Sequence, residues 1–322
     1  MQPSIKPPAR TLQLPKPEPL AGFLNLLKPP GMTSNDAVTT LKRALRNREP
    51  NLAIGHAGTL DPEAAGVLPI MLGRGTRLFD YLTGKQKEYI AEWVPGVVTD
   101  TQDATGRIIK TSQEVPDKHA LDEVLARFVG EIEQTPSAYS AIKQDGVPLY
   151  ERARRGEQVE IQPRLVNIDR LEWLGETERG RMLRVVCGRG VYVRALCEDI
   201  GAAVGCAAHM GFLLRSRAGL FSIEDSRTLE EILAVIQKDG PYLKRFRTML
   251  MPLDTPVMDL PKLDAVHPAA EKVLRSGNPL KRLMLSTPDA PEGLYRLYAG
   301  RLYVGVAMLD AIEARIALRM IP

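Results

Sequence analysis

The stretch GHAGTLDPEAAGVLPIMLGRGTR, from Gly55 to Arg77, fits neither an ordinary helix nor an ordinary strand. It is rich in glycine and reaches a proline directly after Asp61. A residue that precedes proline is disfavoured in the helical region, so we expect Asp61 on an extended loop with its carboxylate directed away from the local backbone. A single carboxylate presented on such a loop suits a nucleophile or a general base.

The same residues have a second interpretation. Asp-Pro commonly opens a turn, and glycines mark turns wherever they occur. Taken on spacing alone, the stretch fits a structural turn better than a catalytic loop.

The composition is that of a globular protein with an ordinary core. The chain has 322 residues, of which 44% are hydrophobic and 25% charged, and this length is sufficient for two domains. The net charge of +4 is compatible with an RNA partner without requiring one. We find no apolar run that could cross a bilayer and no signal peptide, so we expect a cytoplasmic protein without a membrane partner.

The cysteines and histidines predict no metal site. Cys187, Cys197 and Cys206 have no metal-ligand spacing, and their odd number gives no disulfide framework. We expect them to be reduced. The four histidines are scattered along the chain, and we therefore expect no zinc.

The pattern of strands and helices along the chain predicts an α+β fold. Strands are expected at residues 23–27, 89–94, 183–187 and 190–193, and helices after Ser34 as the N-cap, around residues 121–128 and after a capping box of Thr228 and Glu231. The elements do not alternate regularly as strand and helix, which argues against a doubly wound sheet.

Three regions are expected along the chain. Residues 1–20 are rich in proline and lysine and predict a flexible tail. Residues 21–250 would form a catalytic domain, followed by prolines near a boundary at 250–261. In residues 251–322, a hairpin at 294–307 and a strand at 315–320 predict a small β-barrel.

The opening stretch resembles the catalytic motif of the pseudouridine synthases that act on the T loop of tRNA. That motif reads G-H-x-G-x-L-D-P-x-A-x-G-x-L-P, and residues 55–69 match every fixed position. Further segments resemble the family's motifs, and these are Lys28–Ser34, Lys87–Tyr89, Pro136–Lys143 and Cys187–Arg194. The resemblance covers about residues 23–221 and reverses the preference for a structural turn.

The resemblance implies a role for each matching residue. Asp61 would be the nucleophile, attacking either C6 of the uracil or C1′ of the ribose, and Arg194 would form an ion pair with it. Tyr89 would stack on the uracil and assist proton transfer. Four further residues are expected to bind the substrate. His56 would contact the flipped-out RNA, and Tyr192 and Leu213 would line the uracil pocket. The fourth is Lys28, in the segment Lys28–Ser34.

Three positions depart from the family pattern. Val191 replaces a frequent threonine, Leu214 replaces an arginine in a Leu-Arg-Arg run, and Pro95 stands where the family usually reads Leu-Gly. None of them is Asp61, Tyr89 or Arg194, so they bear on RNA contacts rather than on the chemistry.

The resemblance also predicts the sheet, the partners and the domains. It implies a catalytic domain built on a mixed, mainly antiparallel sheet with flanking helices. It implies base flipping of the T-loop uridine at position 55 of tRNA, recognition of the T-arm stem-loop, no redox cofactor or nucleotide, and a PUA-like RNA-binding domain at 251–322. A monomer that needs no guide RNA is expected. Alternatives are a guide-RNA-dependent relative and an RNA-binding or RNA-folding protein. A phosphate-loop enzyme fits poorly, because Gly73–Thr76 lacks the lysine spacing of such loops.

Overall fold

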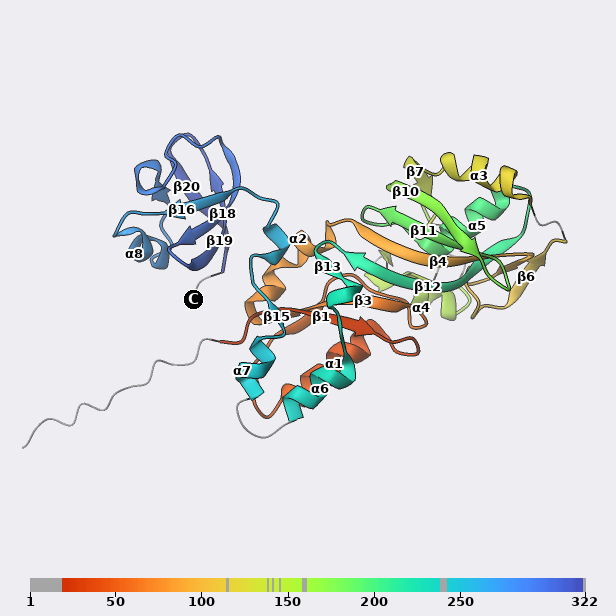
Figure 1. The fold of residues 1–322 in the computed structure, drawn as a ribbon, viewed down its shortest axis with the longest axis horizontal. Coiled ribbons are helices and arrows are strands. Elements are labelled where there is room, and N and C mark those ends of the chain that lie inside the picture. Colours follow the sequence, from red (N-terminus) through yellow and green to blue (C-terminus); the bar gives the residue numbers. More distant parts are fainter. Residues whose placement is uncertain are drawn as a thin grey trace, which may run out of the picture.

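A mixed sheet of eleven strands forms the centre of the molecule (Figure 1). The computed structural model describes residues 19–113, 116–137, 139–140, 142–144, 146–157, 161–237 and 242–320, so most of the predicted tail lies outside the described residues. The main path through the sheet runs β14-β1-β3-β12-β4-β11-β10-β7, with β13, β15 and β2 attached to β12, β1 and β3. Its strands are β1 (Gly22–Lys28), β2 (Ile54–His56), β3 (Ala65–Leu72), β4 (Lys87–Pro95), β7 (Gly130–Gln134), β10 (Arg164–Glu176), β11 (Arg181–Cys187), β12 (Ala208–Ala218), β13 (Phe221–Ser222), β14 (Arg227–Thr228) and β15 (Leu250–Met251).

The predicted α+β class with a mainly antiparallel sheet is confirmed. Only β1–β14 and β12–β3 pair in parallel within this sheet. Alternating burial explains why the central segments are strands. In β11, for example, Leu183, Val185 and Cys187 are buried while the residues between them are partly exposed.

Helices cover the sheet in two groups (Figure 1). Helices α1 (Ser34–Leu45) and α6 (Leu229–Gln237) contact each other, and α6 contacts β1. Helix α5 (Val193–Ala203) packs on β12 and β4, and α3 (Lys118–Ala126) lies against α5 and β10. The other α-helices in the described part of the chain are α2 (Phe79–Thr83), α4 (Leu149–Arg154), α7 (Tyr242–Arg247) and α8 (Ala270–Arg275). Among the described residues, no helix combines the length and apolar character needed to cross a membrane.

A second sheet forms a separate lobe near the C-terminus (Figure 1). Its order is β16-β18-β19-β20-β17, and its strands are β16 (Lys262–Ala265), β17 (Leu280–Lys281), β18 (Gly293–Ala299), β19 (Leu302–Leu309) and β20 (Glu313–Arg319). The predicted hairpin is therefore confirmed as β18 and β19. A bridge between Ala265 and Leu285 brings the end of β16 toward the segment after β17, so the sheet curls part of the way toward a barrel.

Two short hairpins complete the fold. Strands β5 (Val97–Thr99) and β6 (Ile108–Thr111) pair with each other on either side of a polar turn, and β8 (Lys143–Gln144) pairs with β9 (Val147–Pro148).

Two local predictions were wrong. Thr33, not Ser34, caps α1, because its hydroxyl accepts from the Asp36 amide while the Asp36 carboxylate accepts from the Thr33 amide. Residues 189–190 form a turn, residues 191–192 are irregular rather than a strand, and α5 begins at Val193. Gly190 has φ +91°, which a regular strand does not accommodate. The predicted capping box of Thr228 and Glu231 is confirmed.

The cap of α1 gives a first testable prediction. Replacing Thr33 with alanine removes the hydroxyl that satisfies the Asp36 amide, and we expect the free energy of unfolding to fall by about 1 kcal/mol. Urea denaturation measures this change. Thr39→Ala, in the middle of α1, is the control and should leave stability unchanged or slightly higher, because alanine is the better helix former. Equal losses in the two variants would contradict the assignment of the cap.

Candidate active site

The loop between β2 and β3 carries Asp61 and is fixed from several sides. The Ser34 hydroxyl accepts from the Leu60 amide at 2.9 Å and donates to the Leu60 carbonyl at 3.1 Å. The buried Lys28 ammonium donates to the Pro62 carbonyl at 2.9 Å. These bonds hold the backbone on either side of Asp61, so the carboxylate projects from a rigid loop, as the sequence predicts.

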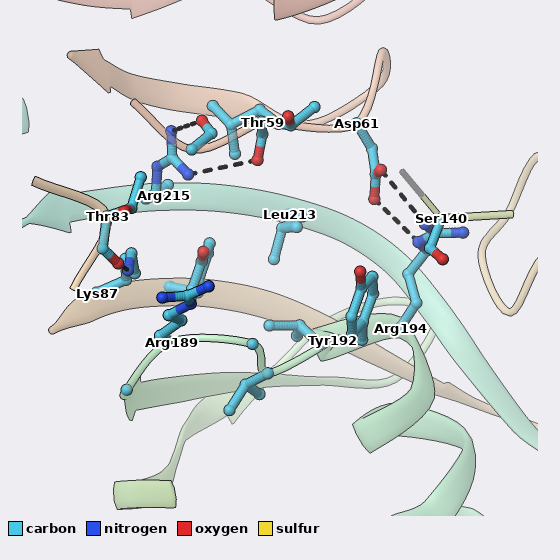
Figure 2. A pocket seen from close by; sticks show the side chains of 17 residues that line it. Thr59, Asp61, Thr83, Lys87, Ser140, Arg189, Tyr192, Arg194, Leu213 and Arg215 are labelled. Carbon is cyan, nitrogen blue, oxygen red and sulfur yellow. Dashed lines mark hydrogen bonds and ion pairs between the residues drawn. The ribbon is translucent and has the colours of Figure 1, made fainter. Parts of the chain in front are cut away.

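Asp61 is paired with Arg194. The Arg194 Nε lies 2.9 Å from Asp61 Oδ2, and Nη2 lies 3.3 Å from Oδ1 (Figure 2). Arg194 stands in the first turn of α5 and its side chain is 6% exposed, whereas that of Asp61 is 36% exposed. The contact is therefore a two-point ion pair in which the arginine is buried and the carboxylate remains accessible.

Other groups fix the Arg194 guanidinium. Its Nη1 donates to the Thr101 carbonyl at 3.0 Å, and its Nη2 donates to the Tyr139 carbonyl at 3.1 Å. The Asp103 carboxylate lies 3.9 Å from Nη1. The sequence analysis did not single out Asp103, which stands in the turn between β5 and β6 and is far from Arg194 along the chain.

A pocket of about 280 Å³ opens beside the ion pair. It is lined by Asp61 and Arg194 and also by Tyr89, Tyr192 and Leu213, all of which the sequence predicted for the site. Figure 2 shows Leu213 and Tyr192 between the ion pair and the opposite end of the pocket, where Lys87, Thr83 and Arg189 lie. The pocket thus combines an accessible carboxylate with aromatic and aliphatic walls, an arrangement suited to a planar base.

Tyr89 forms a buried wall of this pocket. Burial raises the pKa of its phenol above the ordinary value, and the positive charge of Arg215 acts in the opposite direction. The phenol is therefore neutral at physiological pH and retains its proton as a hydrogen-bond donor.

Arg215 is a second residue that the sequence did not assign to the site. It is 1% exposed and lies on β12. Its guanidinium donates to the carbonyls of Val67 at 2.7 Å and Gly58 at 3.0 Å, and more distantly to Thr59 at 3.5 Å. Arg215 therefore holds the first half of the Asp61 loop, as Figure 2 shows. The Leu-Leu-Arg run at 213–215 was the available sequence signal.

Lys28 does not line the pocket. It is fully buried, and its ammonium donates to the carbonyls of Pro29, Met32 and Pro62 at 2.8, 2.6 and 2.9 Å. Burial lowers the pKa of Lys28 to about 8, and the carboxylates of Glu63 and Asp61 act in the opposite direction. This environment is that of a residue that supports the loop from behind rather than one that contacts a substrate.

The Lys28 pKa gives a prediction about stability. Below about pH 8 the folded protein bears the full cost of burying the charged ammonium. Between about pH 8 and the ordinary pKa of 10.5, the folded state loses the proton before the unfolded state does, so stability gains a contribution that rises with pH. We expect the free energy of unfolding of the unmodified protein, relative to Lys28→Met, to increase across this window. Urea denaturation of both proteins at a series of pH values measures the difference, and a difference that is flat or falls with pH would contradict this assignment.

His56 also lies outside the pocket lining. It is the last residue of β2, and its Nδ1 is buried without a hydrogen-bond partner. Burial lowers the pKa of its imidazole, and Arg215 lowers it further. Within the described part of the chain, no group of three or more His, Cys, Asp or Glu side chains is placed to hold a metal ion.

Two family models match the chain. The model described as TruB family pseudouridylate synthase (N terminal domain) covers residues 42–193, and that of the tRNA pseudouridylate synthase B C-terminal domain covers residues 194–258. The chain belongs to the TruB family of pseudouridylate synthases. The first match includes Asp61, Tyr89 and Tyr192, and the second begins at Arg194 and includes Leu213.

Curated relatives and solved structures agree with this TruB family assignment. The tRNA pseudouridine synthase B of Pseudomonas fluorescens is 40% identical over 93% of the chain and 95% of its own length. That of Heliobacterium modesticaldum is 48% identical over 67% of the chain and 71% of its own length. A chain from the crystal structure of a Cbf5-Nop10-Gar1 complex is 27% identical, covers 94% of this chain with 85% of its own, and has a TM-score of 0.70.

Proposed function

We propose that this protein is a stand-alone tRNA pseudouridine synthase that converts the T-loop uridine at position 55 to pseudouridine. The single observation that carries the proposal is the Asp61 carboxylate, held by the buried Arg194 at a pocket with aromatic and aliphatic walls. The relatives named tRNA pseudouridine synthase B support tRNA as the substrate.

The reaction is an isomerisation that matches the groups in the pocket. The N1–C1′ bond of uridine breaks, C5 of the base bonds to C1′, C5 loses a proton and N1 gains one. No electrons are exchanged, so we propose that the enzyme needs no cofactor. The target base must first leave its stack, and the pocket walls formed by Tyr89, Tyr192 and Leu213 would receive it.

Asp61 would act as the nucleophile in this scheme. The two-point contact with Arg194 fixes the direction of the carboxylate toward the pocket. Attack at C6 of the base and attack at C1′ of the ribose both use this carboxylate. Tyr89, kept neutral by burial, would stack on the base and take part in the proton transfer at C5.

Lys28 and His56 would act from outside the pocket. We propose that Lys28 contributes by fixing the Asp61 loop through the Pro62 carbonyl. His56, in the strand before that loop, would meet RNA bound over the pocket. Neither Lys28 nor His56 would therefore contact the flipped base directly.

The C-terminal lobe would bind RNA as a PUA-like domain at residues 251–322. The curled five-stranded sheet and the likeness to a chain of the Cbf5-Nop10-Gar1 complex over 94% of this chain support this assignment. The lobe would contact tRNA through shape and phosphates. Residues 21–250 would form the catalytic domain, and the protein would act in the cytoplasm as a monomer.

A guide-RNA-dependent enzyme is the second candidate, because the similar solved chains come from complexes such as an H/ACA RNP bound to a substrate RNA. An unmodified tRNA transcript incubated with the purified protein alone distinguishes the two. Carbodiimide labelling and primer extension should show pseudouridine at position 55, and a transcript with cytidine there should show none. Binding without modification would overturn the stand-alone proposal and favour a guide-dependent or RNA-folding role.

A further inference from the structure

Gln134 lies buried behind the pocket at the end of β7. It is 2% exposed and pairs with Arg164 of β10, close to the point where α5 begins. Gln134 belongs to none of the family motifs, and the proposed reaction does not use it. A buried primary amide requires hydrogen-bond partners, and those partners indicate what the residue does.

Both polar atoms of the Gln134 amide bind the backbone of Tyr192. The Tyr192 N–H donates to Gln134 Oε1 at 2.8 Å, and Gln134 Nε2 donates to the Tyr192 carbonyl at 3.2 Å. Tyr192 is the N-cap of α5 but supplies no side-chain cap of its own. Gln134 therefore fixes the backbone at the start of the helix from a distant strand.

The start of α5 carries two groups of the proposed active site. The Tyr192 side chain lines the pocket, and Arg194, two residues further on, holds Asp61. A displacement of the Tyr192 backbone would therefore move a wall of the pocket and the partner of the nucleophile together. Small displacements of such groups reduce rates strongly, by about 10²-fold for a 1 Å misplacement.

Asp199 further restricts the residue type at position 134. Burial, and then the neighbouring Glu198, raise the pKa of Asp199 to about 6, while the Gln134 amide favours the charged carboxylate. The amide thus acts both as an acceptor and as a donor toward the Tyr192 backbone, and its effect on Asp199 is that of a neutral donor group. An ionised glutamate has the same shape but cannot donate to the Tyr192 carbonyl.

We propose that Gln134 is a positioning residue for pseudouridine formation. It fixes the start of α5, so that Tyr192 is placed against the flipped base and Arg194 against Asp61. The inference rests on the proposed function. It concerns the rate of the chemical step and not the affinity for tRNA, because Gln134 is buried and contacts protein backbone.

The test compares Gln134→Glu with the unmodified protein and with Gln113→Glu, which makes the same change at an exposed position. Single-turnover rates on unmodified tRNA, tRNA affinity and melting temperature are measured for each. We expect Gln134→Glu to lower the rate about 10- to 100-fold with tRNA affinity within about threefold. Gln113→Glu should match the unmodified protein.

A double variant separates positioning from stability. Gln134→Glu/Asp199→Asn removes the new contact between carboxylates, so the melting temperature should recover, but the Tyr192 carbonyl still lacks its donor and the rate should remain low. A folded Gln134→Glu with the unmodified rate, or a rate that recovers together with the melting temperature, would overturn the inference. An inactive unmodified protein would instead overturn the proposed function.

Discussion

Replacing Asp61 with asparagine is expected to reduce pseudouridine formation by at least about 10⁴-fold, because the amide keeps the shape of the side chain but lacks the carboxylate that we propose as the nucleophile. The variant should still fold, since the loop is held through backbone groups by Ser34, Lys28 and Arg215. It should also still bind tRNA. Single-turnover rates with enzyme in excess of tRNA measure the loss.

Glu63→Gln is the matched control for Asp61→Asn. Glu63 is an exposed acid on the same loop, two residues after Asp61, so its replacement makes the same chemical change without removing the paired carboxylate. We expect this variant to retain most of the activity. Equal losses in the two variants would show that the charge of the loop, rather than the Asp61 carboxylate, supports the reaction.

The second large effect is expected for Arg194→Lys. Lysine keeps the positive charge, but its compact ammonium cannot bind both Asp61 oxygens while also donating to the carbonyls of Thr101 and Tyr139. We expect the single-turnover rate to fall by about 10²-fold or more, because the carboxylate loses its fixed direction. The melting temperature should also fall, since a buried arginine loses its hydrogen bonds.

Arg189→Lys provides the comparison, because Arg189 lines the same pocket but is exposed. This variant should reduce the rate much less than Arg194→Lys. If both lysine variants behave alike, the pocket would require positive charge in general, and the specific geometry of the ion pair would not matter.

Local sequence signals predicted much of the fold. Alternating apolar residues indicated the central strands, and the capping box of Thr228 and Glu231 marked the start of α6 correctly. At the start of α1 both Thr33 and Ser34 could serve as a cap. Ser34 is instead used by the Asp61 loop, a contact that only the folded chain brings about.

The incorrect strand at 190–193 has a similar cause. Tyr192 has no side-chain cap, and its backbone is fixed by Gln134 from β7, so the cap that permits α5 to begin is absent from the local sequence. The β-branched Val191 and Val193 favoured a strand in its place.

The site itself was predicted only where a motif identified it. Asp61, Tyr89, Tyr192, Arg194 and Leu213 lie in one pocket as expected. Arg215 and Asp103 were missed, because the groups that they contact are distant in sequence, and the Leu-Leu-Arg run at 213–215 did not by itself indicate which loop Arg215 holds. Lys28 was identified by its motif, but its burial behind the loop depends on the packing of β1 against β3.

The most direct test of the account uses a tRNA T-arm stem-loop labelled with tritium at C5 of the target uridine. Formation of pseudouridine releases this hydrogen to water. With the purified protein in excess and no guide RNA, metal or nucleotide added, the account predicts one tritium released for each stem-loop and none with Asp61→Asn. Release that persists in Asp61→Asn, or no release from a stem-loop that the unmodified protein binds, would contradict the assignment of Asp61 as the nucleophile of a stand-alone synthase.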